Sequence, residues 1–433
     1  MQSRLIVKNF GPIDFVDLDL RNVNVFIGPQ ASGKSALAKL YTIFKAPRKF
    51  IKNFEVKENQ EVLFKNILEE YNIASFLKKD TEIEFDSELH SLSYKGGEII
   101  YNAKLLKKIE EIEILGENFG INFDIVKDKI HSLSNSFIVF RFRVQEYLVG
   151  KDYLKNHLST LENFISLTKI DFLKIVEFIK ETEENLSANT SLYIPAERNF
   201  INIIKNAALN LQLNNVPIPK NILSFGAELE KASIKEIDLD FLRKDLMYKS
   251  INGEDRIFTS DNESIKLSEA ASGVQSVLPI LIPILSRDNF LDHRSFVIEE
   301  PELNLFPLAQ YELIKLLEST RYDYSNYYED AGTIHTYTTH SPYILSALNN
   351  LLYAEKIRIN QRKNGKVDLE KDFAINKIIS ASINPNSFTA YQISNGKAQS
   401  IFNRETGLID DNYIDEASDK MADDFDALME LMK

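Results

Sequence analysis

Apolar and polar residues alternate with two different periods along the first 47 positions of the chain. The segment Val16–Leu20 alternates apolar residues with aspartates, which predicts a half-buried strand. The apolar run Val23–Ile27 predicts a buried strand, and the apolar positions between 36 and 44 recur at helical spacing. The chain is therefore expected to begin with strand, turn, strand, strand, loop and helix, with Pro47 closing the helix.

The pattern changes twice in the next part of the chain. Residues 81–102 have strand character around a Lys95–Gly97 hairpin turn. Residues 103–189 carry charged and apolar residues at helical spacing, which predicts a helical insertion. The heptad is not sustained, so a plain helical subdomain and a coiled-coil arm both stay open. Strand character returns at 191–194, and a second, partly helical insertion is expected at about 200–245.

The remaining pattern predicts an alternation of helices and strands. Two strands are expected at 255–259 and 264–267, followed by helix, strand, helix and strand up to about residue 350. Residues 351–433 are expected to add C-terminal strands and an acidic helix. That helix, at 410–433, is amphipathic, and we expect it to dock on the body of the protein rather than to serve as a docking tail for a partner.

Composition narrows the class of protein. The chain of 433 residues has no cysteine, which excludes disulfides and thiolate metal sites. Its net charge of −13 does not favour indiscriminate binding of nucleic acid, although a local basic groove stays possible. The apolar run Val277–Leu285 is too short to span a bilayer and holds two prolines. With no signal-peptide pattern at the start, we expect a soluble, cytoplasmic protein without a membrane partner.

The segment Gly28–Ser35 fits the G-x-x-x-x-G-K-[ST] phosphate-binding loop, between a predicted strand and a predicted helix. Glycines let backbone N–H groups surround phosphates, Lys34 reaches the β- and γ-phosphates, and the Ser35 hydroxyl suits Mg²⁺. An ordinary glycine-rich turn is the competing interpretation, and the strand–loop–helix context disfavours it. The expected nucleotide-binding residues are Gly28, Pro29, Gln30, Ala31, Ser32, Gly33, Lys34, Ser35 and Ala36.

Two later strands end in residues that complement this loop. The apolar run from Ser295 ends in Glu299 and Glu300, which would meet the loop at the carboxyl edge of the sheet. Glu299 is placed to hold Mg²⁺, and Glu300 to orient and deprotonate the attacking water. His340 follows another β-branched strand and could bond a γ-phosphate. Solvated charges and a structural histidine are the competing interpretations; the phosphate loop favours catalytic roles for Glu300, His340 and Lys34.

A turn of small residues opens the apolar helix that follows Ala271. Ser272, Gly273 and Gln275 would offer a hydroxyl and a helix N-terminus, which together suit an anion. One molecule does not need two γ-phosphate sites, whereas two molecules that face each other do. The sequence therefore predicts that each subunit offers this turn to the nucleotide of its partner.

As an ordered set, these motifs resemble the ABC-type ATPases of the SMC, RecF and OLD kind, including those of prokaryotic antiphage systems such as OLD, Septu and PARIS. The likeness covers residues 1–102, 190–200 and 250–350. It implies an α/β fold, an ABC-type P-loop NTPase head with a mixed central sheet, an antiparallel part and an inserted helical arm. It also implies ATP and Mg²⁺, a signature motif at 271–275 that acts in trans, and a switch histidine at His340.

Three positions depart from the pattern of that family. Ala196 or Glu197 stands where a Q-loop glutamine is usual, Glu299 replaces the commoner aspartate, and Phe306 stands where a histidine is frequent. The Toprim nuclease pattern of OLD proteins is not found after His340. The resemblance thus implies an ATPase that controls a separate effector, a nuclease or toxin, in phage defence. A DNA-repair or DNA-maintenance ATPase and a nucleotide-dependent scaffold are the alternatives.

Overall fold

The computed structural model of the chain describes most residues outside the first insertion. The described residues are 2–46, 60–87, 90–102, 191–204, 213–214, 216, 218–231, 234–259, 263–286, 295–323, 333–363, 369–379 and 381–431. The helical insertion predicted at 103–189 lies outside these residues. The division of the chain into domains therefore stays a prediction.

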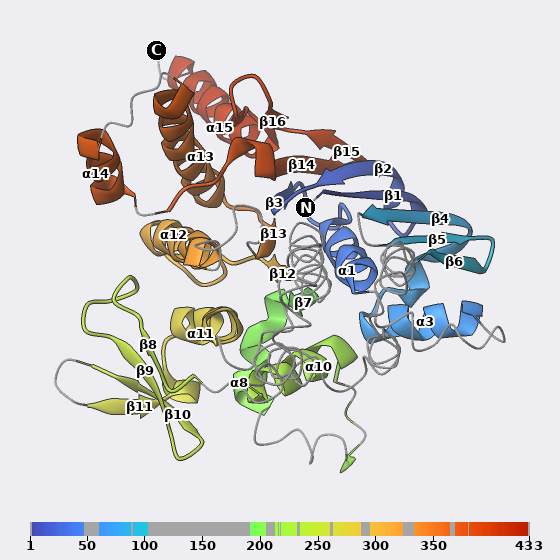
Figure 1. The fold of residues 1–433 in the computed structure, drawn as a ribbon, viewed down its shortest axis with the longest axis horizontal. Helices are drawn as coiled ribbons and strands as arrows, with labels where there is room; N and C mark the ends of the chain where they lie inside the picture. Colours follow the sequence, from blue (N-terminus) through green and yellow to red (C-terminus); the bar gives the residue numbers. More distant parts are fainter. Residues whose placement is uncertain are drawn as a thin grey trace, which may run out of the picture. The chain divides into compact units, whose positions relative to one another are not determined.

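An 11-stranded mixed sheet forms the centre of the described structure (Figure 1). Its strands β14, β3, β13, β12 and β7 are parallel, and β6, β5, β4, β1 and β2 are antiparallel. This arrangement confirms the predicted α/β class with a mixed sheet and an antiparallel part. The strands, in spatial order, are β6 (Glu98–Asn102), β5 (Ser91–Lys95), β4 (Leu77–Ser87), β1 (Ser3–Phe10), β2 (Ile13–Leu20), β15 (Lys397–Ser400), β14 (Phe388–Ser394), β3 (Val23–Ile27), β13 (Ile334–Thr338), β12 (Ser295–Glu299) and β7 (Ser191–Ile194).

Helices cover both faces of the parallel strands, and every residue of β3, β12 and β13 is buried. Because side chains alternate across a strand, Val25 and Ile298 join one core cluster, whereas Phe26 and Val297 join the other. The second cluster includes α1 and α3, and the first includes the other helices that contribute to the core. The helices are α1 (Lys34–Lys45), α3 (Gln60–Glu70), α8 (Asn199–Ile204), α10 (Lys220–Glu230), α11 (Ser272–Leu285), α12 (Pro307–Asp323), α13 (Pro342–Lys363), α14 (Leu369–Ile378) and α15 (Tyr413–Glu430).

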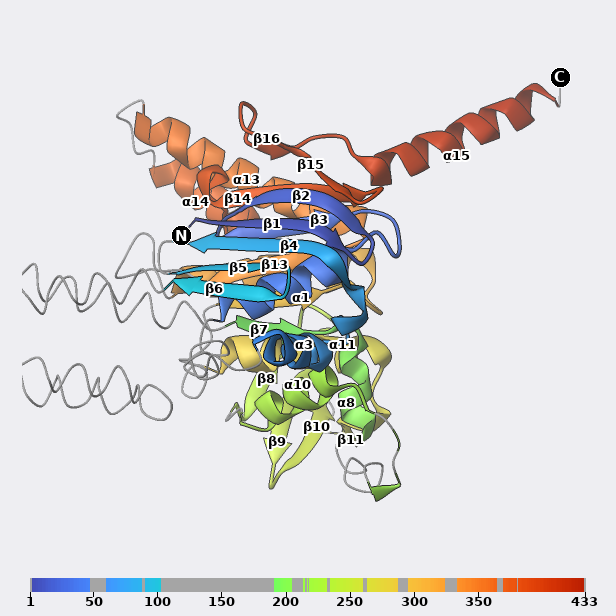
Figure 2. The same ribbon diagram turned by 90° about the vertical axis from the view of Figure 1, so that its right-hand side faces the viewer.

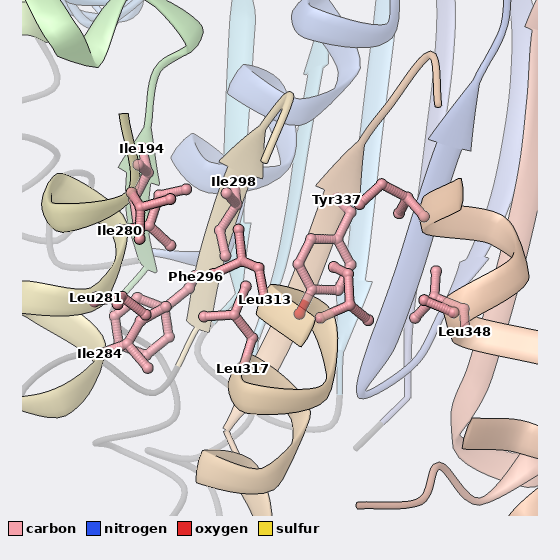
Figure 3. Close-up of a cluster of buried hydrophobic side chains, with 14 of the residues drawn as sticks. Ile194, Ile280, Leu281, Ile284, Phe296, Ile298, Leu313, Leu317, Tyr337 and Leu348 are labelled. Carbon is pink, nitrogen blue, oxygen red and sulfur yellow. The ribbon is translucent and has the colours of Figure 1, made fainter. Parts of the chain in front are cut away.

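The first cluster joins β12, the strand that ends in the candidate acids, to α11, the helix that begins at the small-residue turn (Figure 3). Phe296 and Ile298 of β12, Ile280 and Ile284 of α11 and Leu313 of α12 are all drawn in this cluster. All of these side chains are buried. Residues of α11 and β12 therefore contribute to the same buried core.

A second sheet of four strands, in the order β11, β10, β9, β8, lies outside the central sheet. Its strands are β8 (Glu236–Asp238), β9 (Met247–Ile251), β10 (Glu254–Phe258) and β11 (Ser264–Lys266). The predicted strands at 255–259 and 264–267 correspond to β10 and β11. The sequence interpretation missed β8 and β9, because Glu236–Asp238 is too short to display a period and Met247–Ile251 lacks strict alternation.

The C-terminal segment contributes to the middle of the central sheet and then leaves it. Strand β14 pairs in parallel with β3, directly beside the phosphate-loop strand. A short hairpin of β16 (Phe402–Asn403) and β17 (Leu408–Ile409) precedes α15. The predicted acidic helix exists, but the expectation that it docks on the body is wrong beyond its first turn, because Phe425 and Leu428 are largely exposed. Figure 2 shows α15 running away from the central sheet. In the described part of the chain, no helix has the length and hydropathy of a membrane span.

Candidate functional site

The segment between β3 and α1 adopts a conformation that only small residues permit. Gly28 and Gly33 have φ angles of 143° and 103°, and Ala31 has a φ of 60°. A Cβ atom on Gly33 would meet Ile13 Cδ1 at 2.5 Å, and one on Gly28 would collide with the Ile393 carbonyl. Helix α1 begins at Lys34, so the free N–H groups of its first turn face the end of the loop.

Lys34 is almost fully buried at the start of α1. Its Nζ donates hydrogen bonds to the carbonyls of Gly28, at 2.8 Å, and Pro29, at 2.7 Å. Burial lowers the pKa of Lys34 to about 8, and the charges of Glu300 and Glu299 partly oppose this shift. A phosphate beside this ammonium would supply the negative charge that restores its proton affinity.

Glu299 ends β12 with its side chain buried, and burial raises its pKa. Its Oε1 atom has no hydrogen-bond partner among the described residues, and neither has the buried Ser32 Oγ in the phosphate loop. The nearby Ser35 hydroxyl favours the ionised carboxylate of Glu299. Oxygen atoms without protein partners, next to a hydroxyl on the first helical turn, fit a hard divalent cation such as Mg²⁺.

Glu300 lies just beyond β12 in a left-handed backbone conformation, with a φ of 42°. Such a conformation costs about 1–3 kcal/mol for a residue with a Cβ atom. Its side chain is partly exposed, and Oε1 lies 3.9 Å from Nε2 of His340, the residue two positions beyond β13. Burial, followed by the charge of Lys34, lowers the pKa of His340, so its imidazole is neutral at pH 7.

Two further side chains hold this geometry, and the sequence interpretation missed both. The first is Glu302, whose Oε1 accepts hydrogen bonds from the Thr339 hydroxyl and the His340 backbone N–H, both at 2.8 Å. It joins the turn after β12 to the turn after β13. Its position two residues after Glu300 was the available signal, but the partner turn lies 38 residues further along the chain.

The second is Arg198, which is fully buried at the end of the short 3-10 helix η2 (Ala196–Arg198). Its guanidinium donates to the carbonyls of Glu299, at 2.7 Å, Glu300, at 2.8 Å, and Ser276, at 2.7 Å. Burial lowers its pKa to about 10, so it stays charged. Arg198 therefore ties the strained acidic turn to the first turns of α11. A buried arginine has no local sequence signature, which is why it was missed.

The small-residue turn lies at the beginning of α11, with Ser272 exposed. A Cβ atom on Gly273 would lie 2.9 Å from the Asn304 carbonyl, so this glycine allows α11 to approach the turn after β12. Asn304 Nδ2 also donates to Ser276 Oγ at 2.9 Å. The Gln275 side chain donates to the carbonyls of Ser268 and Ala270, and so it stabilises its own loop.

The structure thus brings Lys34, Glu299, Glu300 and His340 together at the ends of three adjacent parallel strands. It also shows where the departures from the family pattern lie. Glu197 is exposed beside Arg198. Phe306 is 86% exposed, which is unusual for a phenylalanine and leaves its ring available for contact with another molecule.

The family model of the AAA ATPase domain matches residues 1–345 of the chain. Solved structures similar to the chain include the SMC head domain from Thermotoga maritima, with 11% identity, a TM-score of 0.38, and coverage of 92% of this chain and 98% of that one. An SmcHead bound to the C-winged helix domain of ScpA shares 9% identity, with a TM-score of 0.40, 92% of this chain and 96% of that chain. No curated protein matches the sequence.

Proposed function

The chain belongs to the AAA ATPase domain family, and we propose that it binds and hydrolyses ATP with Mg²⁺ and dimerises through the bound nucleotide. The observation that carries the proposal is the convergence of Lys34, Glu300 and His340 around the buried Glu299. Glu300 and His340 approach to 3.9 Å, and the charge of Lys34 contributes to the lowered pKa of His340. A lysine that can bind phosphates, together with carboxylates that can bind a metal ion and orient water, suits phosphoryl transfer to water.

Each residue has a defined role in this proposal. The loop N–H groups and Lys34 bind the phosphates, while Ser35 and Glu299 hold Mg²⁺, which neutralises charge on the phosphate oxygens. Glu300 orients and deprotonates the attacking water, because its carboxylate is partly exposed and aimed at His340. The neutral His340 can hydrogen-bond the γ-phosphate and maintain the distance to Glu300.

The proposed dimer completes the site through the turn of the other subunit. Ser272 is exposed, and the first N–H groups of α11 are free to bind an anion. Arg198 and Asn304 hold this turn firmly on the acidic turn of its own subunit. Binding or hydrolysis of an ATP molecule between two subunits would therefore affect the position of the catalytic residues in both subunits.

We further propose that the dimer controls a separate effector in phage defence. This part rests on the sequence resemblance to antiphage ATPases. Copurification of the chain with the product of the neighbouring reading frame, with and without ATP, tests it. A DNA-maintenance ATPase is the alternative, and it requires salt-sensitive duplex binding with stimulation of hydrolysis.

The ATPase activity itself is tested with two variants and one control. Lys34→Ala is expected to abolish ATP binding, and Glu300→Gln to retain binding but lose hydrolysis. Glu312→Gln removes a half-buried carboxylate that, among the described residues, forms an ion pair with Lys315 of the same helix, and it should behave as the parent. Hydrolysis by Glu300→Gln at the parent rate would show that the catalytic assignment is wrong.

A further inference from the structure

Helix α15 is anchored at one end only. The Asn412 side chain accepts from the Ile414 N–H, and Asp415 Oδ2 accepts from the Asn412 N–H, which together form a capping box. The Tyr413 N–H donates to Gln392 of β14, and Ile414 packs against the core. The first turn is therefore attached to the central sheet. Figure 2 shows the rest of the helix continuing away from that sheet.

One face of this helix is apolar and exposed along its outer turns. Met421, Phe425 and Leu428 follow i, i+4, i+7 spacing, and their exposed fractions are 66%, 62% and 63%. The same stripe begins at Ile414, which packs on the core of the protein. It then runs on to Leu431, which is 83% exposed. An amphipathic helix of this kind presents its anchors in the spacing that a hydrophobic groove accepts.

The charge of the helix indicates what can cover the stripe. Acidic residues fill most of the remaining outer positions, and the single lysine, Lys420, lies 3.6 Å from Asp424. The α15 helix of a second copy is equally acidic, so two such helices would repel each other. Anionic lipid and nucleic acid would be repelled for the same reason. A surface with lysines and arginines at its border would be attracted. On the outer turns the exposed acids are Asp419, Asp423, Asp424, Asp426 and Glu430.

We propose that α15 is a docking helix for a different protein, which receives the Met421–Leu428 stripe in an apolar groove bordered by Lys and Arg. The groove desolvates the three anchors, and the basic border pairs with the acids beside them. Identifying that protein as the effector rests on the function proposed above, whereas the docking itself does not.

The test uses the full chain in the cells that encode it, with the photo-crosslinking substitution Met421→benzoylphenylalanine. The crosslinked protein is identified, purified, and titrated against the parent chain and against Phe425→Ser. We expect the substitution to weaken binding at least tenfold, which equals about 1.4 kcal/mol. Raising the NaCl concentration fourfold should also weaken binding, because the border is electrostatic.

A matched control separates docking from general surface effects. Phe373→Ser on α14 also removes an exposed phenylalanine, 73% exposed, and it should bind the partner as the parent does. Adducts with a second copy, with lipid or with nothing would overturn the proposal. Equal binding by Phe425→Ser and the parent would overturn it too. ATP hydrolysis should be unchanged in Phe425→Ser. The docking test and the tests of ATPase activity can therefore fail separately.

Discussion

Substitution of Arg198 tests whether a buried side chain holds the catalytic turn in its strained conformation. Arg198 donates three hydrogen bonds shorter than 3 Å, to the carbonyls of Ser276, Glu299 and Glu300. In Arg198→Lys, the ammonium keeps the charge but is a point donor that cannot span these three acceptors. The carbonyls of Glu299 and Glu300 would then no longer be held by one planar group.

The size of the effect follows from the bonds and from the strain. Loss of two of three charged hydrogen bonds, at roughly 1.5 kcal/mol each, lowers the free energy of unfolding by about 3 kcal/mol. A domain of ordinary stability, about 5–15 kcal/mol, still folds. The φ of 42° at Glu300 is then free to relax. Relief of about 1.4 kcal/mol of strain would reduce the fraction of molecules that hold Glu300 in its catalytic conformation about tenfold, and kcat would fall by the same factor.

The assay combines denaturant unfolding, ATP binding and steady-state hydrolysis. Arg198→Lys should lower both stability and kcat, while ATP affinity changes little because Arg198 contacts none of the phosphate-loop residues by a described hydrogen bond. Arg256→Lys is the matched control, because Arg256 pairs with Glu254 in the second sheet and is partly exposed. A kcat within twofold of the parent, in a folded Arg198→Lys protein, would refute the role of Arg198.

Two more predictions concern single residues of the site. The pKa of Lys34, lowered to about 8, means that the free protein loses this positive charge as the pH rises through 8. Isothermal titration of the parent chain with a non-hydrolysable ATP analogue should therefore find binding about tenfold weaker at pH 9 than at pH 7, and a flat profile would contradict the assignment. Gly273→Ala should lower the free energy of unfolding by about 1–3 kcal/mol, because its Cβ would lie 2.9 Å from the Asn304 carbonyl. Gly226→Ala, also helical but with its nearest atom at 3.7 Å, should be neutral or stabilising by about 1 kcal/mol in the same denaturant titration; equal losses would remove the packing explanation.

Local sequence predicted the phosphate loop and the elements around it because the residues that form them are contiguous in the chain. The strand, the glycines and Lys34 lie within a dozen residues, and each constrains the next. The contacts that organise the site are not contiguous. Arg198 and Glu299 are 101 residues apart, and Thr389 bonds Asn24 across 365 residues. No periodicity in the sequence encodes such pairs. The hydrogen bonds of Arg198 and the position of β14 in the middle of the sheet could therefore be found only from the structure.

The acidic helix shows a different limit of sequence reasoning. Its spacing predicted the helix and its apolar face. The same spacing cannot distinguish a face that packs on its own body from one that awaits a partner, because both require the same residues. The exposure of Phe425 and Leu428 shows that this part of the face does not pack on the described body of the chain. Glu302 is a second example of a side chain whose contacts the sequence does not reveal. Its carboxylate resembles an ordinary surface charge in the sequence, whereas in the structure it bonds Thr339 and His340.

The central claim is that each ATP site is shared between two subunits, and subunit mixing tests it most directly. Ser272→Arg blocks the exposed turn, whereas Glu300→Gln removes the base, and each variant alone should be inactive. Mixed before ATP is added, they should form heterodimers with one intact site, restoring about a quarter of the parent ATPase rate. No recovery in the mixture, or full activity of Ser272→Arg alone, would contradict a site completed by the partner subunit.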